Sequence, residues 1–245
     1  MVQYNPLQYL PSATELPDSD DTPVDNELQN LIPNLLLAIL AIVWSQRMDW
    51  YFGVDMGIYY LPGQFPQTPL VPDGFLSLGV ERRKRDGGRL SYVLWEENNV
   101  VPVLALEVVS QTYGKEYDEK QRKYAQLGVL YYVIYNPEYW QRDEHEPFEV
   151  YRLESGDYVR QLEPVWMPEI GLGIGCAQGT YKGWNREWLY LFDQQGKRFP
   201  SPDEEAASLR QQLQQERQRA EQERQRAEQL VELLRQMGVN PNEFL

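Results

Sequence analysis

The chain has 245 residues with 37 acidic and 23 basic side chains, and its formal net charge of −14 excludes a protein whose whole surface attracts nucleic acid. Its 42% of hydrophobic residues suffice for a core, and a single cysteine, Cys176, excludes an internal disulfide and is typical of a reducing compartment. Since the sequence shows neither a secretory signal nor an apolar stretch of bilayer length, we expect a cytoplasmic protein.

The N-terminal part of the chain predicts a lead-in, a helix and a strand. Residues 1–24 are rich in Pro, Ser, Thr and Asp without a hydrophobic period, which indicates a flexible or loosely docked segment. From Asp25 onward leucines and isoleucines recur at helical spacing, although Pro33 must lie in the first turn of this helix or kink it. The aromatic and β-branched stretch Met48–Leu61 predicts a strand or hairpin arm, and Asp55 within it is a weak candidate site residue.

An acid and a basic cluster follow this strand. Asp73 lies in a Pro-Asp-Gly tripeptide, and taken alone it is an ordinary turn residue. The only dense basic cluster runs from Arg82 to Arg85 and continues to Arg89, with a glycine pair that indicates a loop. Two interpretations remain open for this loop: a solvated segment, or a segment that contacts phosphates beside an active site.

The central stretch, residues 101–135, predicts a strand, a helix and a second strand. The apolar run Val101–Leu106 suits a strand buried on both faces, and Glu107 then interrupts it. A carboxylate in such a place is costly unless it is paired, hydrogen-bonded or bound to a metal. A helical pattern over 117–127, closed by Gly128, leads to the apolar run Val129–Tyr135. We therefore expect a right-handed crossover that joins two parallel, central strands.

The C-terminal part predicts a hairpin and a helical tail. Two strand-like segments flank Ser155-Gly156-Asp157, and Trp184, Trp188 and Tyr190 are interpreted as core residues. From Asp203 the composition changes, and the heptapeptide ERQRAEQ occurs twice in tandem. Its seven-residue period predicts a coiled coil that joins two copies into a homodimer. Because polar residues weaken the middle of the seam, a lone, partly frayed helix is the alternative.

These residues together resemble a known family. The order Pro72-Asp73, Glu107-Val108-Val109-Ser110, Lys120 with Tyr124, and Gly128-Val129 resembles the Uma-type restriction endonucleases of the PD-(D/E)xK nuclease superfamily. The resemblance covers about residues 25–200. It implies an α/β, restriction endonuclease-like domain with a mixed sheet flanked by helices, over residues 25–202, and a coiled-coil-like helix over 203–245. Val109 stands where the superfamily carries a lysine, and the resemblance implies Lys120 as its replacement.

The resemblance also implies a chemistry. Asp73 and Glu107 would bind a metal ion with the main-chain carbonyl of Val108, and Lys120 would assist the attacking water or the transition state. Carboxylates without a histidine or cysteine cluster select Mg²⁺, with Mn²⁺ as a substitute. The function implied is a metal-dependent endonuclease that hydrolyses phosphodiester bonds in DNA, with Asp73, Glu107 and Lys120 as catalytic residues. The alternatives are a structural ion pair between Glu107 and Lys120, and a catalytically silent module that acts through its coiled-coil tail.

Overall fold

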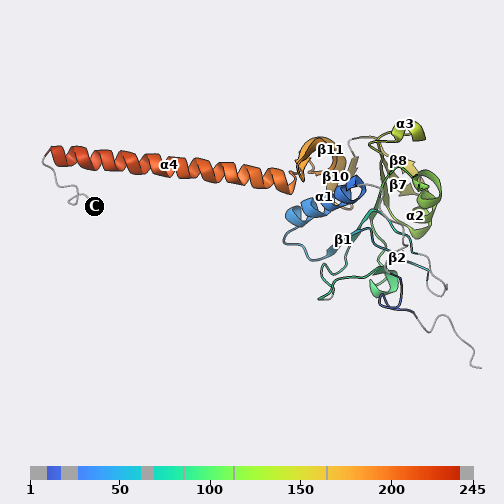
Figure 1. The fold of residues 1–245 in the computed structure, drawn as a ribbon. Coiled ribbons are helices and arrows are strands. Elements are labelled where there is room, and N and C mark those ends of the chain that lie inside the picture. The colour runs from blue at the N-terminus through green and yellow to red at the C-terminus, as the bar shows by residue number, and fades with distance from the viewer. Residues whose placement is uncertain are drawn as a thin grey trace, which may run out of the picture. The chain divides into compact units, whose positions relative to one another are not determined.

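The computed structural model describes residues 10–17, 27–61, 69–84, 86–112, 114–163 and 165–237. They form two compact units, traced in Figure 1. One unit contains the described residues up to Gly179 together with Asn185–Phe199, and the other contains Thr180–Trp184 and the chain from Pro200. The division into a lead-in (1–24), a domain (25–202) and a tail (203–245) stays a prediction.

A six-stranded mixed sheet is the centre of the first unit (Figure 1). The strands, in the order in which they lie, are β1 (Trp50–Val54), β3 (Gly74–Leu78), β5 (Leu104–Val108), β6 (Tyr131–Tyr135), β7 (Phe148–Glu154) and β8 (Asp157–Arg160). Only β5 and β6 are parallel neighbours in this sheet, and each residue of both strands is buried. The predicted α/β, restriction endonuclease-like fold and its central parallel pair are confirmed.

The crossover from β5 to β6 differs in detail from the single predicted helix. It begins with a π-helical turn, η2 (Glu116–Lys120), and continues as α2 (Gln121–Leu127). The Lys120 N–H donates to the Lys115 carbonyl, five residues back, at 3.1 Å. Gly128 ends α2 at a φ of 90°, the left-handed conformation that a glycine C-cap supplies. Such widened turns occur often at functional sites, and this one carries Lys120.

Helix α1 (Glu27–Val43) packs against β1 and β5. Its helical apolar period is confirmed, because Ile32, Leu35, Leu36, Ile39 and Leu40 are all buried. Pro33 lies beyond the first turn, inside the helix, and is itself buried. Burial of this face attaches α1 to β5, the strand that carries Glu107, and to β1, the neighbour of β3.

Smaller elements surround the sheet. They are β2 (Ile58–Tyr59), β4 (Tyr92–Val93), η1 (Leu94–Glu96), α3 (Trp140–Asp143), β9 (Val165–Met167), β10 (Leu172–Tyr181) and β11 (Trp184–Phe192). Strands β2 and β4 form a parallel pair, and β9, β10 and β11 form a three-stranded sheet. Trp188 and Tyr190 are fully buried as predicted, but Trp184 is 47% exposed, so its assignment to the core is wrong. Trp184 is the first residue of β11 and directly follows the turn at Lys182 and Gly183, in the exposed N-terminal half of the strand.

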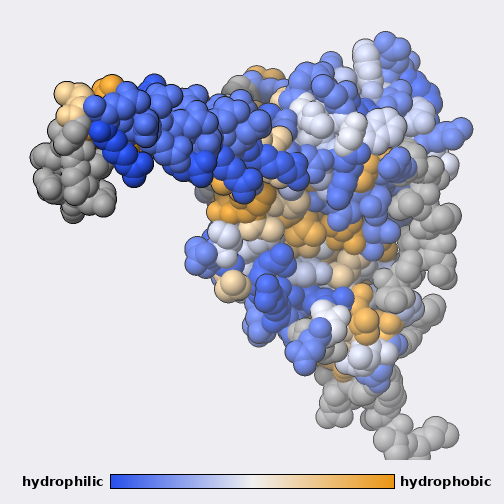
Figure 2. Space-filling view, turned by 60° about the vertical axis from the view of Figure 1, so that its left-hand side comes forward, coloured by the Kyte–Doolittle hydropathy of each residue, from blue (hydrophilic) through white to orange (hydrophobic). Residues whose placement is uncertain are grey.

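Helix α4 (Pro202–Gln236) begins at a capping box. The Glu204 N–H donates to the Ser201 hydroxyl, and the Ser201 N–H donates to the Glu204 carboxylate. No residue of α4, all of which the structure describes, is buried. Figure 2 shows it as hydrophilic along most of its length, with apolar atoms near its C-terminal end. In the described part of the chain, no helix combines the length and the apolar character that a membrane crossing needs.

Candidate active site

The two predicted acids lie at one end of neighbouring strands. Asp73 directly precedes β3, and Glu107 is the fourth residue of β5. These strands pair antiparallel with Gly74 opposite Leu106, and one further step along this register places Asp73 opposite Glu107. The Val108 N–H donates to Asp73 Oδ2 at 2.6 Å and so fixes the carboxylate of Asp73 against β5. The fold thus brings together acids that are far apart in the sequence.

Glu107 is 1% exposed and has a partner on each carboxylate oxygen. The Tyr124 hydroxyl donates to Oε1 at 2.6 Å, and Lys120 Nζ donates to Oε2 at 2.8 Å. Both partners come from the crossover and lie four residues apart, so they project from the same side of it. These hydrogen bonds offset the cost of burying the carboxylate. They also place the Lys120 ammonium at the end of β5.

The structure gives a reason for the missing lysine at position 109. Val109 is 2% exposed and belongs to an apolar cluster with Ala105, Tyr124 and Tyr132. A lysine side chain in this cluster would have to leave the core or lose its charge. Lys120 reaches Glu107 from the crossover instead. This is the position that a replacement for the missing lysine requires, although its role stays a prediction.

The electrostatics of Asp73 and Lys120 are coupled. Burial raises the pKa of Asp73 well above its usual value, and the negative charge of Glu107 raises it further. Burial lowers the pKa of Lys120, but the charge and hydrogen bond of Glu107 and the charge of Asp73 outweigh it, so this pKa lies above its ordinary value. The two acidic neighbours of Lys120 therefore favour its charged form.

Two further side chains belong to this site and were not predicted from the sequence. The Gln29 side chain, from α1, hydrogen-bonds Asp73 and opposes the rise of its pKa. Glu116 opens the π-helical turn, is 4% exposed, and accepts the Gly114 N–H on its two oxygens at 3.1 and 3.0 Å. Burial raises the pKa of Glu116, and the charge of Glu107 raises it further. The only feature of the sequence that could have pointed to Glu116 is its position between the turn at Gly114 and the predicted helix over 117–127.

The weak candidate Asp55 contacts the site through its main chain. Its N–H donates to the main-chain carbonyl of Asp73 at 3.1 Å, while Asp55 itself is exposed. Within the described ranges, no three His, Cys, Asp or Glu side chains gather as a ready cation site. The candidate site is therefore the pair Asp73 and Glu107, with Lys120 beside it.

The family model Uma2, described as "Putative restriction endonuclease", matches residues 20–174, well over half of the chain. The chain belongs to the Uma2 family. The matched segment contains Asp73, Glu107, Lys120 and Tyr124, the residues that meet at the ends of β3 and β5. No curated protein and no solved structure matches the chain. Membership in Uma2 indicates a nuclease and agrees with the restriction endonuclease-like fold.

The raised pKa of Asp73 predicts how the stability of this Uma2 protein varies with pH. A carboxyl group whose pKa is higher in the folded than in the unfolded chain favours folding at low pH and loses this contribution as the pH rises through its folded pKa. Without divalent metal, we therefore expect Asp73→Asn to have a higher thermal midpoint than the wild type at neutral pH. This difference in midpoint should become smaller as the pH falls. The pKa of Glu116 is also raised, so its contribution to the stability of both proteins is likewise lost as the pH rises.

Thermal unfolding in EDTA checks this expectation for wild type and Asp73→Asn between about pH 4.5 and about pH 8. The quantity to follow is the difference between the two midpoints, because carboxylates with lowered pKa contribute equally to both proteins. A difference that does not change with pH would contradict the assignment.

Proposed function

We propose that this Uma2 protein is a metal-dependent endonuclease that hydrolyses phosphodiester bonds in DNA. Asp73 and Glu107 would hold Mg²⁺, and Lys120 would lie beside the reacting phosphate. The observation that carries the proposal is the meeting of these three side chains, with Lys120 Nζ 2.8 Å from Glu107 and Asp73 held by the Val108 N–H at 2.6 Å. Family membership supports a nuclease, and DNA as substrate follows from the family description.

The donor set fits Mg²⁺ better than a transition metal. Mg²⁺ keeps several waters and usually takes only one or two carboxylates from a protein, so a pair of acids suffices. The burial and mutual repulsion that raise the pKa of Asp73 are what a bound cation would relieve. The Val108 carbonyl, the proposed third ligand, belongs to the residue whose N–H already holds Asp73. Mn²⁺ prefers similar oxygen ligands and would substitute.

The protein side chains would divide the remaining work. When bound, Mg²⁺ would acidify a water molecule and counter the charge of the phosphate. Lys120, protonated at neutral pH, would stabilise the negative charge that develops on the phosphate oxygens. Tyr124 is completely buried and, because burial raises its pKa, it stays a hydrogen-bond donor to Glu107. It would orient the carboxylate toward the metal.

Cleavage of a supercoiled plasmid tests this proposal. The wild-type protein should nick or linearise the plasmid with Mg²⁺ or Mn²⁺ and should leave it intact in EDTA. A folded protein that cleaves with neither metal would overturn the proposal. It would favour the alternative function, a catalytically silent nuclease-like module that acts through α4.

We further propose that α4 joins two copies of the chain into a homodimer through a coiled coil. A single helix in water gains little beyond propensity and side-chain pairs worth about 0.2–0.5 kcal/mol each, so a long exposed helix benefits from a partner. Leu209, Leu213 and Leu230 of the predicted seam are 65%, 48% and 57% exposed. A dimer would also present two sites to the two strands of a duplex.

Light scattering on a Leu230→Gln/Leu234→Gln variant checks the dimer. The variant should be monomeric at concentrations at which the wild type is dimeric, because two apolar seam positions become polar. Glu232→Gln is the control, since position 232 lies outside the seam, and it should leave the dimer intact. A monomeric wild type, or a dimer in all three proteins, would show that the seam does not drive association.

A further inference from the structure

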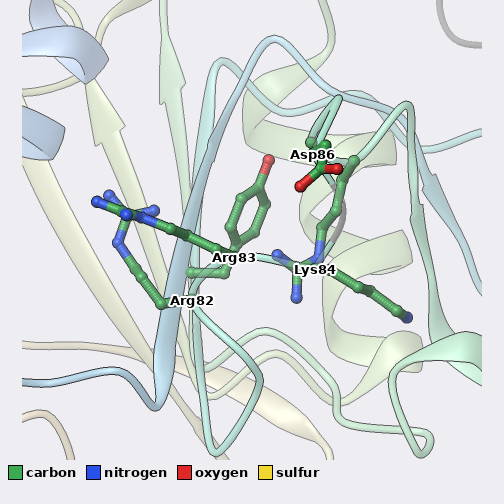
Figure 3. Close-up of a pocket in the computed structure, with 7 residues that line it drawn as sticks. Arg82, Arg83, Lys84 and Asp86 are labelled. Carbon is green, nitrogen blue, oxygen red and sulfur yellow. The ribbon is translucent and has the colours of Figure 1, made fainter.

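A basic pocket lies beside β1 and the loop that follows β3. Its volume is about 670 Å³, and four cationic side chains line it with one acid, Asp86. The cations are Arg82, Arg83, Lys84 and Arg89. Figure 3 shows Arg82 and Arg83 reaching to one side of the pocket and Lys84 to the other. In a chain with a net charge of −14, this local excess of positive charge requires an explanation.

Two of the four cations maintain the pocket's shape. Glu97, 5% exposed, accepts hydrogen bonds from Lys84 Nζ at 2.8 Å and from Arg89 Nε at 2.9 Å. The Arg89 guanidinium also lies 4.2 Å from the ring centre of Tyr51, on β1. Lys84 and Arg89 are thus neutralised in part by a buried carboxylate. They hold the loop in place and leave the other two cations to face the pocket.

Arg82 and Arg83 have no carboxylate at ion-pair distance in the part of the chain that the structure describes. Arg82 is nevertheless held in position. Its main-chain N–H donates to the Met48 main-chain carbonyl at 3.0 Å, and its guanidinium lies 4.0 Å from the ring centre of Trp50. Burial lowers the pKa of Arg82, and the charges of Arg83 and Arg89 lower it further. A bound anion would relieve this repulsion.

The position of the pocket in the fold relates it to the candidate active site. Asp73 directly precedes β3, and Gly79, Val80 and Glu81 separate the five residues of β3 from Arg82. At about 3.4 Å per residue, these five residues span about 17 Å. Successive base pairs of DNA also advance by about 3.4 Å along the axis, so the same span corresponds to about five base pairs. A duplex cleaved at Asp73 is long enough to reach the pocket with its flank.

We propose that this pocket binds a backbone phosphate of the DNA flank, several nucleotides from the bond that is cleaved, with Arg82 and Arg83 as its ligands. The guanidinium fork matches phosphate oxygens and never loses its charge. A phosphate contact positions a duplex without reading its sequence, so the pocket would hold DNA on an acidic protein in one register. This inference rests on the proposed function, because it assumes that DNA is the substrate.

Fluorescence anisotropy with a labelled duplex, in EDTA and at several NaCl concentrations, tests the pocket. We expect Arg82→Gln/Arg83→Gln to weaken binding about ten-fold or more and to reduce the slope of log K against log salt by about 1 to 2. Arg83→Gln alone, at an exposed side chain without an ion-pair partner among the described residues, should fold as the wild type does and should reduce the slope by up to about 1. Arg210→Gln/Arg235→Gln in α4 removes the same charge elsewhere and should leave binding nearly unchanged.

Several results would overturn the inference: no DNA binding by the wild type, unchanged binding by the pocket variants, or an equal loss in the α4 control. A thermal-shift arm with inorganic phosphate at matched ionic strength identifies the phosphate source. If phosphate stabilises the wild type but the pocket variant binds DNA normally, the pocket takes free phosphate only and the inference fails. Since EDTA removes metal chemistry, a protein that binds DNA here but never cleaves it would overturn only the proposed function.

Discussion

Replacement of Glu107 by glutamine should lower Mg²⁺-dependent cleavage about a thousand-fold or more while the protein stays folded. A metal ion contributes several kcal/mol to transition-state stabilisation, and each 1.36 kcal/mol is about ten-fold in rate. Glutamine keeps an oxygen that accepts from Tyr124 or Lys120, which lie 2.6 and 2.8 Å from the carboxylate oxygens, but it loses the charge that attracts the ion. Plasmid cleavage and thermal unfolding of the same preparation measure the two effects.

A buried carboxylate elsewhere in the sheet provides the matched control. Glu149 on β7 is 3% exposed and accepts the Tyr151 hydroxyl at 2.7 Å, and Ile134 of β6 separates it in register from Glu107. Neighbouring strands lie about 4.7–4.9 Å apart, so the backbones that carry Glu107 and Glu149, two strands apart, are separated by about 10 Å. Glu149→Gln should keep cleavage near the wild-type level. An equal loss in both variants would mean that buried carboxylates support the fold and that Glu107 is not a metal ligand.

Alanine at position 107 is expected to behave differently from glutamine. Like glutamine, it would relieve the repulsion between Glu107 and Asp73 and would remove the counter-ion of Lys120, but it would also leave the Tyr124 hydroxyl buried without this acceptor. An unsatisfied buried polar group costs about 1–3 kcal/mol, so the net change is destabilising. For this reason glutamine separates chemistry from folding more clearly than alanine does.

The central part of the fold was predictable because its signals are local. Continuous apolar runs predicted β5 and β6, since a strand buried on both faces needs apolar residues at successive positions. Gly128 predicted the end of α2, because a C-cap needs a left-handed conformation that glycine adopts at no steric cost. The same kind of local reasoning failed for Trp184, whose exposure depends on its place at the start of β11 and not on its side chain.

The candidate site was predictable only in part. Asp73, Glu107 and Lys120 were named from a family resemblance, but their proximity depends on the antiparallel register of β3 with β5 and on the π-helical turn. The apolar runs predicted which segments are strands, but they predicted neither the pairing of β3 with β5 nor the widened turn. Gln29 carried no signal at all, because its contact with Asp73 depends on how α1 lies on the sheet. The pairing of β3 with β5 and the contact of Gln29 with Asp73 join elements that are distant in the sequence, whereas the π-helical turn is a local detail.

Replacement of Lys120 by methionine should lower the cleavage rate about a hundred- to a thousand-fold, the usual effect of removing one donor that stabilises transition-state charge. Its ammonium is 2.8 Å from Glu107, and its side chain is 28% exposed, so it reaches the edge of the site. Lys123→Met is the matched control: it lies on α2, is 45% exposed and pairs with Glu119 at 2.7 Å. The control should cleave at nearly the wild-type rate.

A second substitution at the same position distinguishes a fixed cation from a general base. The pKa of Lys120 lies above its ordinary value because Glu107 and Asp73 favour the charged form against the effect of burial, so the residue is protonated at neutral pH. If Lys120 acts by its charge, Lys120→Arg should retain a measurable part of the activity, since arginine keeps the charge and the hydrogen bond. If Lys120 had to accept a proton, arginine would be as inactive as methionine, and the wild-type rate would climb steadily with alkaline pH. Cleavage rates of the two variants across pH, with Mg²⁺ saturating, therefore decide which role Lys120 has.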